Sequence, residues 1–400
     1  METAAKKNRT RRILISQHAT ITHYRVRFYE LLEQRRPRDW EFDVVFDTHE
    51  AQNPRLYVEP IDWQHFPFSI LDAHTHILKG GTRGIIWQSF FWRARKYDAV
   101  ITDNFVAHLT YLATHLWRLT GTRRAAWGHT RDRQTPQNAR WLKQMSERFK
   151  RAYFKTWDFF FAYTEGEAQI ARGMNFPGNR IAVLNNTIDI TAERAAYEAI
   201  QPRREQLRAD AGFAADNKVL LYVGRLIADK RIDFLAESFA AAWNADPTWR
   251  LVVVGAGPQM NVLEDLRDKL PNGVVTLHGA ITDRAKLAPI YAAADLYIIT
   301  GMIGLAPMQA MCYDLPIIGF ALPIHSPEIE YLSEANSVLL PSETTPADFA
   351  ARLPELYVRY RDAQSREKIF ASIAHLTMEN MVDHFIDGVN RMLALPGRII

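Results

Sequence analysis

The feature that most constrains the fold is residues 219–230, which read VLLYVGRLIADK. An apolar run of this length, ended by glycine, is typical of a strand that a parallel sheet buries on both faces. Gly224 permits a tight turn, and its missing side chain leaves room for a ligand. We therefore expect Arg225 and Lys230 at the carboxyl edge of an open sheet, where α/β proteins bind ligands. Two cations there either bind a diphosphate or are the solvated side chains of an ordinary strand–turn–helix.

The same pattern recurs downstream. Further apolar runs read RLVVV at 250–254, VVTLHG at 274–279 and DLYIIT at 295–300, and segments with helical apolar spacing separate them. Strands that alternate with helices predict a parallel, doubly wound α/β sheet. The Gly-Ala-Gly-Pro that contains Gly257 lacks the third glycine of a dinucleotide-binding fingerprint, so by itself it indicates little.

The first half of the chain predicts a second Rossmann-like domain. Its expected strands lie at 12–16, 41–46, 98–102, 124–128, 159–163 and 181–184, with helices at 25–34 and 105–119. A length of 400 residues suits two domains of ordinary size. We predict an N-terminal domain over 1–205, a second domain over 206–375 and a C-terminal helical segment over 376–400.

Composition limits the setting of the protein. The single cysteine, Cys312, excludes an intramolecular disulfide and fits a reducing compartment. The basic N-terminus leads into an apolar run too short for a signal peptide or a membrane span. We therefore expect a cytoplasmic protein, either free or peripheral at the inner face of a membrane.

The positive charge is concentrated in one stretch. Residues 117–158 hold eleven Lys and Arg against three Asp and Glu, whereas the whole chain carries a net charge of +4. Within this stretch, residues 137–157 combine aromatic residues at helical spacing with surrounding basic residues. Such a helix either lies on an anionic membrane surface or packs its apolar face into the domain core. No nucleic-acid-binding motif accompanies it, so we expect no nucleic-acid partner.

The order and content of the motifs between about residue 215 and residue 345 resemble the donor-binding domain of GT-B glycosyltransferases of family four. The first half matches more loosely, and Asn185-Asn186-Thr187-Ile188-Asp189 resembles the family's Asn-Gly-Val-Asp segment with Thr187 in place of glycine. The resemblance implies two Rossmann-like domains facing a crevice, with the C-terminal helix returning to the first domain. It also implies transfer of a sugar from a nucleotide diphosphate sugar, usually with retention and without a metal or other cofactor.

The resemblance assigns the donor-side residues. Gly224, Arg225 and Lys230 align with the family's diphosphate-binding segment. Gly257, Gly304 and Leu305 align with segments whose backbone lies close to the donor. The family's pair of glutamates is missing, because Gly301 and Gln309 stand at those positions; Gln309 can still hydrogen-bond a ribose. His325-Ser326-Pro327-Glu328 resembles a His-Gly-Pro-Glu element of a polysaccharide-biosynthesis subgroup. Glu328 either contacts the donor or stabilises the helix whose first turn it opens, because a carboxylate there interacts favourably with the helix dipole.

The acceptor-side residues follow strands of the first domain. His129 comes directly after the strand that ends in Trp127-Gly128. The family often has a histidine at this place, near the reaction centre. His129 is either the equivalent of that histidine or an ordinary surface histidine. Tyr24 and Arg25 follow the first strand, and Arg25 either binds an acceptor phosphate or caps a solvated helix. Asp103 and Asn104 end the strand at 98–102 and face the same edge.

We therefore predict a hexosyltransferase that moves a sugar from a nucleotide sugar to a glycan or lipid-linked acceptor. The alternatives are a nucleotide-sugar epimerase and a catalytically degenerate, nucleotide-sugar-binding subunit of a glycosyltransferase complex. Turnover distinguishes them, since transfer needs donor and acceptor, epimerisation needs the donor alone, and a binding subunit shows neither.

Overall fold

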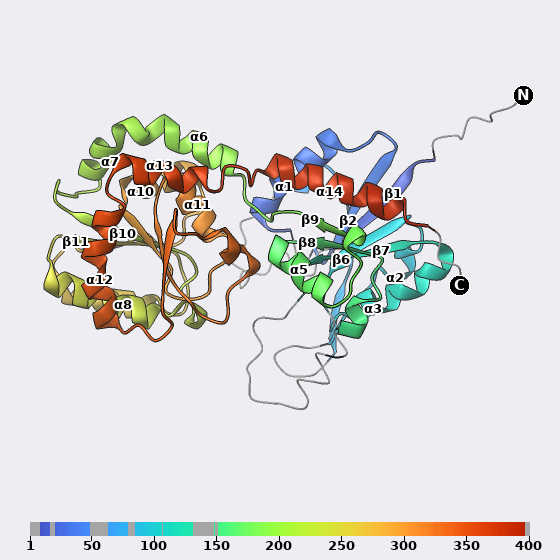
Figure 1. Cartoon of the computed structure of the whole chain (residues 1–400), viewed down its shortest axis with the longest axis horizontal. Coiled ribbons are helices and arrows are strands. Elements are labelled where there is room, and N and C mark those ends of the chain that lie inside the picture. The colour runs from blue at the N-terminus through green and yellow to red at the C-terminus, as the bar shows by residue number, and fades with distance from the viewer. Residues whose placement is uncertain are drawn as a thin grey trace, which may run out of the picture. The chain divides into compact units, whose positions relative to one another are not determined.

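The computed structural model describes residues 9–16, 21–48, 63–78, 85–105, 107–130, 148 and 151–396. The chain divides into two compact units, each an α/β unit with helices on both faces of its sheet (Figure 1). Unit 1 is Met1–Asn186 with Met378–Ile400, and unit 2 is Thr187–Thr377. The boundary thus lies nearer the N-terminus than the expected residue 205. The reason is that α6 (Ile190–Ile200) packs against α10 (Arg284–Ala293) of unit 2.

In the described part of unit 1, a seven-stranded parallel sheet has the order β3-β2-β1-β6-β7-β8-β9. Its strands are β1 (Arg11–Ser16), β2 (Trp40–Phe46), β3 (Ser69–Asp72), β6 (Ala99–Asp103), β7 (Arg123–Gly128), β8 (Phe159–Ala162) and β9 (Ile181–Val183). The six predicted strands are confirmed to within one residue at each end. The short strand β3 and the antiparallel hairpin of β4 (Thr75–Leu78) and β5 (Ile85–Gln88) were not predicted.

Helices cover both faces of the unit 1 sheet. They are α1 (His23–Arg35), α2 (Phe91–Ala94), α3 (Leu109–Ala113), α5 (Glu165–Gly173) and α14 (Met378–Leu393), with 3-10 turns at Trp63–His65, Thr114–Thr120 and Gly178–Arg180. Along β8, Phe159 and Phe161 pack into the core with α1 and α14, whereas Phe160 packs into the opposite core with α5. This alternation is the two-residue period of a strand buried on both faces.

The helix predicted over 105–119 is wrong in its extent. The α-helix ends at Ala113, and residues Thr114–Thr120 form a 3-10 turn. The hydroxyls of Thr114 and Thr120 each donate a hydrogen bond to the carbonyl three residues earlier, at 2.7 Å. Threonine side chains that compete for backbone carbonyls in this way disfavour a continuing α-helix.

Helix α14 completes the core of unit 1. It packs against α1, β8 and β9, and Phe385 contacts the rings of Phe28, Trp127 and Phe161. At Gly388 the helix comes so close to the sheet that a Cβ atom would collide with the ring of Phe161 and lie 2.9 Å from the Cβ of Ala182.

We expect Gly388→Ala to lower the free energy of unfolding by about 1–3 kcal/mol, because the added methyl group overpacks this contact. Chemical denaturation measures the change. The matched control is Gly173→Ala in α5, where nothing lies within 4 Å of the added Cβ. Equal stability of the two variants would contradict the close packing of α14.

Unit 2 contains a six-stranded parallel sheet of order β12-β11-β10-β13-β14-β15. Its strands are β10 (Lys218–Val223), β11 (Trp249–Val254), β12 (Val275–Leu277), β13 (Leu296–Ile298), β14 (Ile317–Phe320) and β15 (Ser337–Leu340). The remaining helices are α7 (Arg204–Asp210), α8 (Ile232–Ala245), α9 (Met260–Lys269), α11 (Ala306–Cys312), α12 (Pro346–Arg359) and α13 (Ala363–Ala371), with 3-10 turns at Gln201–Arg203, Ala228–Lys230 and Pro327–Tyr331. The core on one face includes residues of α6, α10, α11 and α13, and the core on the other includes residues of α8, α9 and α12, so the sheet is doubly wound.

Among the described residues, no helix combines the length and the apolar character that crossing a membrane requires.

Candidate functional site

Three loops of unit 2 meet at the carboxyl edge of its sheet. They follow β10, β11 and β13, which are neighbours in the sheet. The amide N–H of Gly224 donates to the carbonyl of Val254 at 2.9 Å, and that of Leu226 donates to Ala256 at 3.0 Å. A Cβ at Gly257 would collide with the backbone of Leu226. Gly257 is therefore needed for the close approach of two loops at the edge where open α/β sheets bind ligands.

Lys230 joins the loop after β10 to the loop after β13. Its ammonium donates a hydrogen bond to the carbonyl of Met302, and its own carbonyl accepts from the hydroxyl of Thr300 at 2.5 Å. The amide of Met302 donates to the carbonyl of Asp229 at 3.1 Å. The lysine is thus held by the backbone on both sides, and an ammonium has three N–H groups, so it can also bind an anion.

Arg225 is exposed beside Lys230, and its side chain forms no hydrogen bond or ion pair with the described residues. Burial and the nearby Arg225 guanidinium lower the pKa of Lys230 to about 8. Two cations that disfavour each other's charge would be stabilised by an anion between them. The structure thus brings together Gly224, Arg225 and Lys230, as the sequence predicted.

Gly301 is enclosed by backbone. A Cβ at this position would collide with the carbonyl oxygen of Asp229 and lie 2.5 Å from the Cα of Lys230. No side chain, and so no glutamate, fits here while the loop after β10 keeps its position. The absence of a carboxylate at residue 301 is therefore a packing requirement of this chain.

Gln309, on α11, uses both ends of its amide within unit 2. Its Oε1 accepts a hydrogen bond from the hydroxyl of Tyr291 at 3.2 Å, and its Nε2 donates to Glu193 at 3.2 Å. The oxygen of Glu193 that accepts from Gln309 is Oε2, and it also accepts a hydrogen bond from the Tyr313 hydroxyl at 3.1 Å. The Oε1 of Glu193 accepts from Arg284 at 2.7 Å. Glu193 and Arg284 were not predicted from the sequence, because only the packing of α6 against α10 and α11 brings them to Gln309.

The loop that contains Gly304 and Leu305 leads into α11, and a histidine fixes it. The Nδ1 of His325 accepts from the amide of Ile303 at 3.0 Å, and its Nε2 lies 2.7 Å from the carbonyl oxygen of Phe320 and 3.1 Å from the amide nitrogen of Leu322. Leu305 is half-buried against the core. Glu328 is 5% exposed in the first turn of the 3-10 turn at Pro327–Tyr331, so it lies inside unit 2.

In unit 1 the loops after β6 and β7 are tied together. Asn104 donates a hydrogen bond to the carbonyl of His129 at 3.1 Å, and the His129 ring contacts the ring of Tyr163 edge-on at 5.2 Å. Next to it, the amide of Thr130 donates to Glu167 at 2.5 Å. The exposed ring of His129 is thus positioned through its backbone, and Asp103 lies at the end of β6 at the same sheet edge. Glu167 was not predicted from the sequence.

Arg25 lies in the first turn of α1 and is only 7% exposed. Its guanidinium lies over the rings of Trp127 at 5.1 Å, Tyr163 at 5.4 Å and Tyr24 at 5.7 Å. The alternative that Arg25 caps a solvated helix is wrong, because its side chain is buried and the N-cap of α1 is Thr22. Four predicted residues, Tyr24, Arg25, Asn104 and His129, are linked through Tyr163 and Trp127 at the carboxyl edge of the unit 1 sheet.

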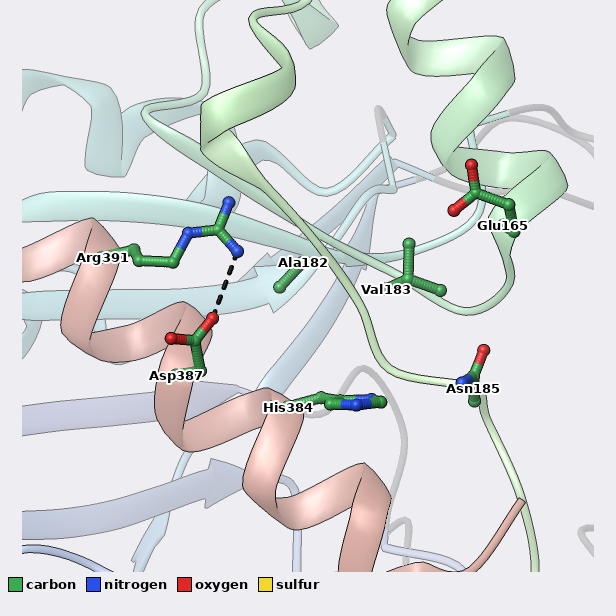
Figure 2. Close-up of a pocket in the computed structure, with 7 residues that line it drawn as sticks. All are labelled: Glu165, Ala182, Val183, Asn185, His384, Asp387 and Arg391. Atoms are coloured by element: carbon green, nitrogen blue, oxygen red, sulfur yellow. Dashed lines mark hydrogen bonds and ion pairs between the residues drawn. The ribbon is translucent and has the colours of Figure 1, made fainter. Parts of the chain in front are cut away.

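A cavity of about 420 Å³ lies elsewhere in unit 1, between α5, β9 and α14 (Figure 2). Glu165, Asn185, His384, Asp387 and Arg391 are among its lining residues, and none of the predicted site residues is. Arg391 pairs with Asp387 at 3.2 Å and donates to the carbonyl of Ile181 at 2.8 Å. Arg391 thus contributes to the packing of α14 on the sheet.

The described residues contain no group of three or more His, Cys, Asp and Glu side chains arranged to hold a metal ion. Most of the basic segment 137–157 lies outside the described residues. In its described end, Tyr153 and Trp157 are buried in the core of unit 1 with Phe160, so these two aromatic residues do not face a membrane.

Comparison with known families gives two matches. A sequence model described as Glycosyl transferases group 1 matches residues 217–358, and one described as Glycosyl transferase 4-like domain matches residues 24–187. Together they cover more than half of the chain, and each of them covers a large part of one unit.

Curated relatives match over shorter segments. The GDP-mannose-dependent alpha-(1-6)-phosphatidylinositol dimannoside mannosyltransferase of Mycobacterium tuberculosis is 30% identical over 125 residues, which are 30% of this chain and 32% of that protein. The alpha-monoglucosyldiacylglycerol synthase of Acholeplasma laidlawii is 29% identical over 125 residues, 30% of each chain. The chain thus spans about a third of the length of these relatives.

Solved structures are similar over nearly the whole chain. Alr3699/HepE of Anabaena, solved in complex with UDP, has a TM-score of 0.65 at 13% identity and covers 95% of this chain and 99% of its own. TarM of S. aureus has a TM-score of 0.62 at 10% identity, with coverage of 95% and 100%. At these identities the likeness shows the fold alone, and it confirms the predicted fold of two Rossmann-like α/β domains.

Proposed function

The chain belongs to the GT-B glycosyltransferases of family four, and from this premise we propose that it transfers a hexose from a nucleotide diphosphate sugar to a glycan or lipid-linked acceptor. The observation that carries the proposal is the pair of cations at the carboxyl edge of unit 2. Arg225 is exposed without a partner among the described residues, and Lys230 is held beside it by the Met302 carbonyl. UDP is bound in the similar structure of Alr3699/HepE, which supports a nucleotide as the ligand.

In this proposal the two cations bind the donor diphosphate and stabilise the negative charge that develops on it as the glycosidic bond breaks. Gly224, Gly304 and Leu305 provide backbone close to the donor, and Gly257 lets the loop after β11 approach. Gln309 and Glu328 are held inside unit 2, so we assign them to shaping the donor site. Members of the family usually retain the anomeric configuration without a metal, and we propose the same here, with the leaving phosphate accepting the proton of the acceptor hydroxyl.

We assign the acceptor to the carboxyl edge of unit 1, where Tyr24, Arg25, Asp103, Asn104 and His129 gather. His129 is the proposed catalytic residue of this unit, because its exposed ring follows β7 directly. The names of two relatives contain a lipid, phosphatidylinositol dimannoside in one and monoglucosyldiacylglycerol in the other, which supports a lipid-linked acceptor here. Such an acceptor would place the protein at a membrane surface.

The affinity for a nucleoside diphosphate should fall as the pH rises through about 8. Lys230 has a pKa of about 8, so above that pH it loses the charge that binds the diphosphate. Binding of the anion favours the charged lysine and moves the midpoint upward. Calorimetric titration with ADP between about pH 7.5 and about pH 10 measures the effect, since the second ionisation of a phosphate, near pH 6, is almost complete there. The control is Lys230→Arg, which stays charged and should remove the pH dependence.

The experiment that tests the proposed function has two stages. Calorimetry first measures the binding of UDP, GDP and ADP and of their sugar conjugates. Release of the nucleoside diphosphate is then followed with and without candidate acceptors. Release that requires an acceptor supports transfer. Change of the sugar by the protein alone would instead indicate an epimerase, and binding without turnover on any acceptor a binding subunit.

A further inference from the structure

We propose that the acceptor carries a phosphate or diphosphate group and that Arg25 binds this group at the carboxyl edge of unit 1. The inference rests on the proposed function, because it names the chemical class of the acceptor that the enzyme would use. It is carried by the surroundings of the Arg25 side chain.

Arg25 is a buried cation without a counterion among the described residues. The residue is 7% exposed, and its Nη1 atom is buried and has no hydrogen-bond partner in the part of the chain that the structure describes. No described Asp or Glu forms an ion pair with it. Burial disfavours the charged guanidinium, whereas the nearby Tyr163, Tyr24 and Tyr29 favour it and raise the pKa of Arg25, but none of these groups is a counterion. An anion would supply the missing partner, and a guanidinium suits phosphate because it donates two parallel hydrogen bonds.

The N-terminus of α1 adds to the attraction for an anion. This helix has 13 residues, no acidic residue in its first turn and no side-chain hydrogen bond from its N-cap, Thr22. Its first N–H groups and the positive end of its dipole therefore lie next to the Arg25 side chain without a negative group from the described residues. The helix end alone would not define a site, but the buried guanidinium of its first turn gives it a specific donor.

The same cluster contains a second group that lacks a partner. The Oδ1 atom of Asn104 is buried without a hydrogen-bond partner among the described residues, while its Nδ2 donates to the His129 carbonyl. The ring of His129 contacts Tyr163, over which Arg25 lies. A ligand with an anionic group and a hydroxyl would pair with both Arg25 and Asn104, and a sugar or lipid phosphate has both kinds of group.

The test uses the full chain with Arg225→Ala and Lys230→Ala, so that unit 2 no longer binds diphosphate. Inorganic pyrophosphate is titrated into this parent and into the same protein with Arg25→Met, which keeps a similar volume without the charge. We expect the parent to bind and the Arg25→Met protein to bind at least about tenfold more weakly, as the loss of a charge-assisted hydrogen bond implies. In the absence of the anion, Arg25→Met should keep or raise the Tm, because an apolar side chain suits an apolar site better than an unpaired cation.

A parallel arm distinguishes the source of the phosphate. Phosphatidylcholine vesicles that contain dodecyl phosphate are compared with vesicles that contain dodecanol, by co-sedimentation with the parent. Binding of pyrophosphate in solution supports an acceptor with a free phosphate group. Binding only to the dodecyl phosphate vesicles, weakened by Arg25→Met, supports a lipid phosphate.

Two results would overturn the proposal. One is a folded parent that binds neither pyrophosphate nor dodecyl phosphate vesicles. The other is an Arg25→Met protein that binds as well as the parent and has a lower Tm, which would make Arg25 a packing residue. If Arg25→Met does not fold, Arg25→Lys takes its place: it should bind several-fold more weakly because it lacks the planar fork, and undiminished affinity overturns the proposal. Donor binding by the unmodified chain is measured separately, so failure of the proposed function is recognised independently.

Discussion

Replacing Arg225 or Lys230 by alanine should raise the dissociation constant for the nucleotide sugar by about tenfold to a hundredfold and lower the rate of transfer by a further large factor. In the proposed site each cation donates charge-assisted hydrogen bonds to the diphosphate, and such bonds contribute about 1.5–3 kcal/mol each. The charge on the diphosphate grows as the glycosidic bond breaks, and removing one such donor costs about 10²–10³ in rate. Calorimetry with the nucleoside diphosphate and steady-state kinetics with the sugar nucleotide measure the two effects.

The matched control is Lys269→Ala. This lysine is exposed in the last turn of α9, and helices of an α/β unit run from the carboxyl edge of the sheet to its amino edge, so Lys269 lies away from the proposed donor site. Its removal should leave binding unchanged. If Arg225→Ala, Lys230→Ala and Lys269→Ala all bind nucleotide like the unmodified chain, the assignment of the diphosphate site is wrong.

Restoring the family's first glutamate should weaken donor binding instead of improving it. Even Gly301→Ala places a Cβ in the space of the Asp229 carbonyl and the Lys230 Cα, so the loop after β10 must move and take Lys230 with it. We expect Gly301→Ala to weaken nucleotide binding by about tenfold or more, as Lys230→Ala does, and Gly301→Glu to weaken it further. Calorimetry measures both.

Gly304→Ala is the control that separates the collision at residue 301 from any general cost of placing alanine in the same loop. The nearest atom to its added Cβ is the Ser326 hydroxyl at 3.8 Å, so its free energy of unfolding should change by less than about 0.5 kcal/mol. Gly301→Ala should lower that free energy by about 1–3 kcal/mol through overpacking. Wild-type affinity in Gly301→Glu would show that the two loops are not in contact when the donor binds.

The periodicity of the chain predicted most of the fold, because strands buried on both faces must be continuously apolar. Val219–Val223 and the run that begins at Phe159 left no alternative to a buried strand. The strand β3 and the β4–β5 hairpin were missed because they are short and largely half-buried or exposed, so burial leaves little pattern in their sequence.

The donor side was predictable where a motif is local and not where contacts are long-range. Arg225 and Lys230 are five residues apart, so their meeting follows from one strand and one turn. Glu193 lies on a separate helix, 116 residues from Gln309 in sequence, and no local sequence pattern predicts their contact. The glycine at 301 was visible as a departure from the family, but its cause, the backbone of Asp229 and Lys230, required the structure.

Because α14 belongs to unit 1, unit 2 is inserted within the sequence of unit 1. During synthesis the whole of unit 2 is therefore made before the helix that covers Phe28, Trp127 and Phe161. Unit 1 thus keeps an aromatic surface uncovered until α14 has been made, although most of its residues come first in the sequence. Unit 2 has no such dependence on a later segment, so the sequence of unit 2 is complete before that of unit 1.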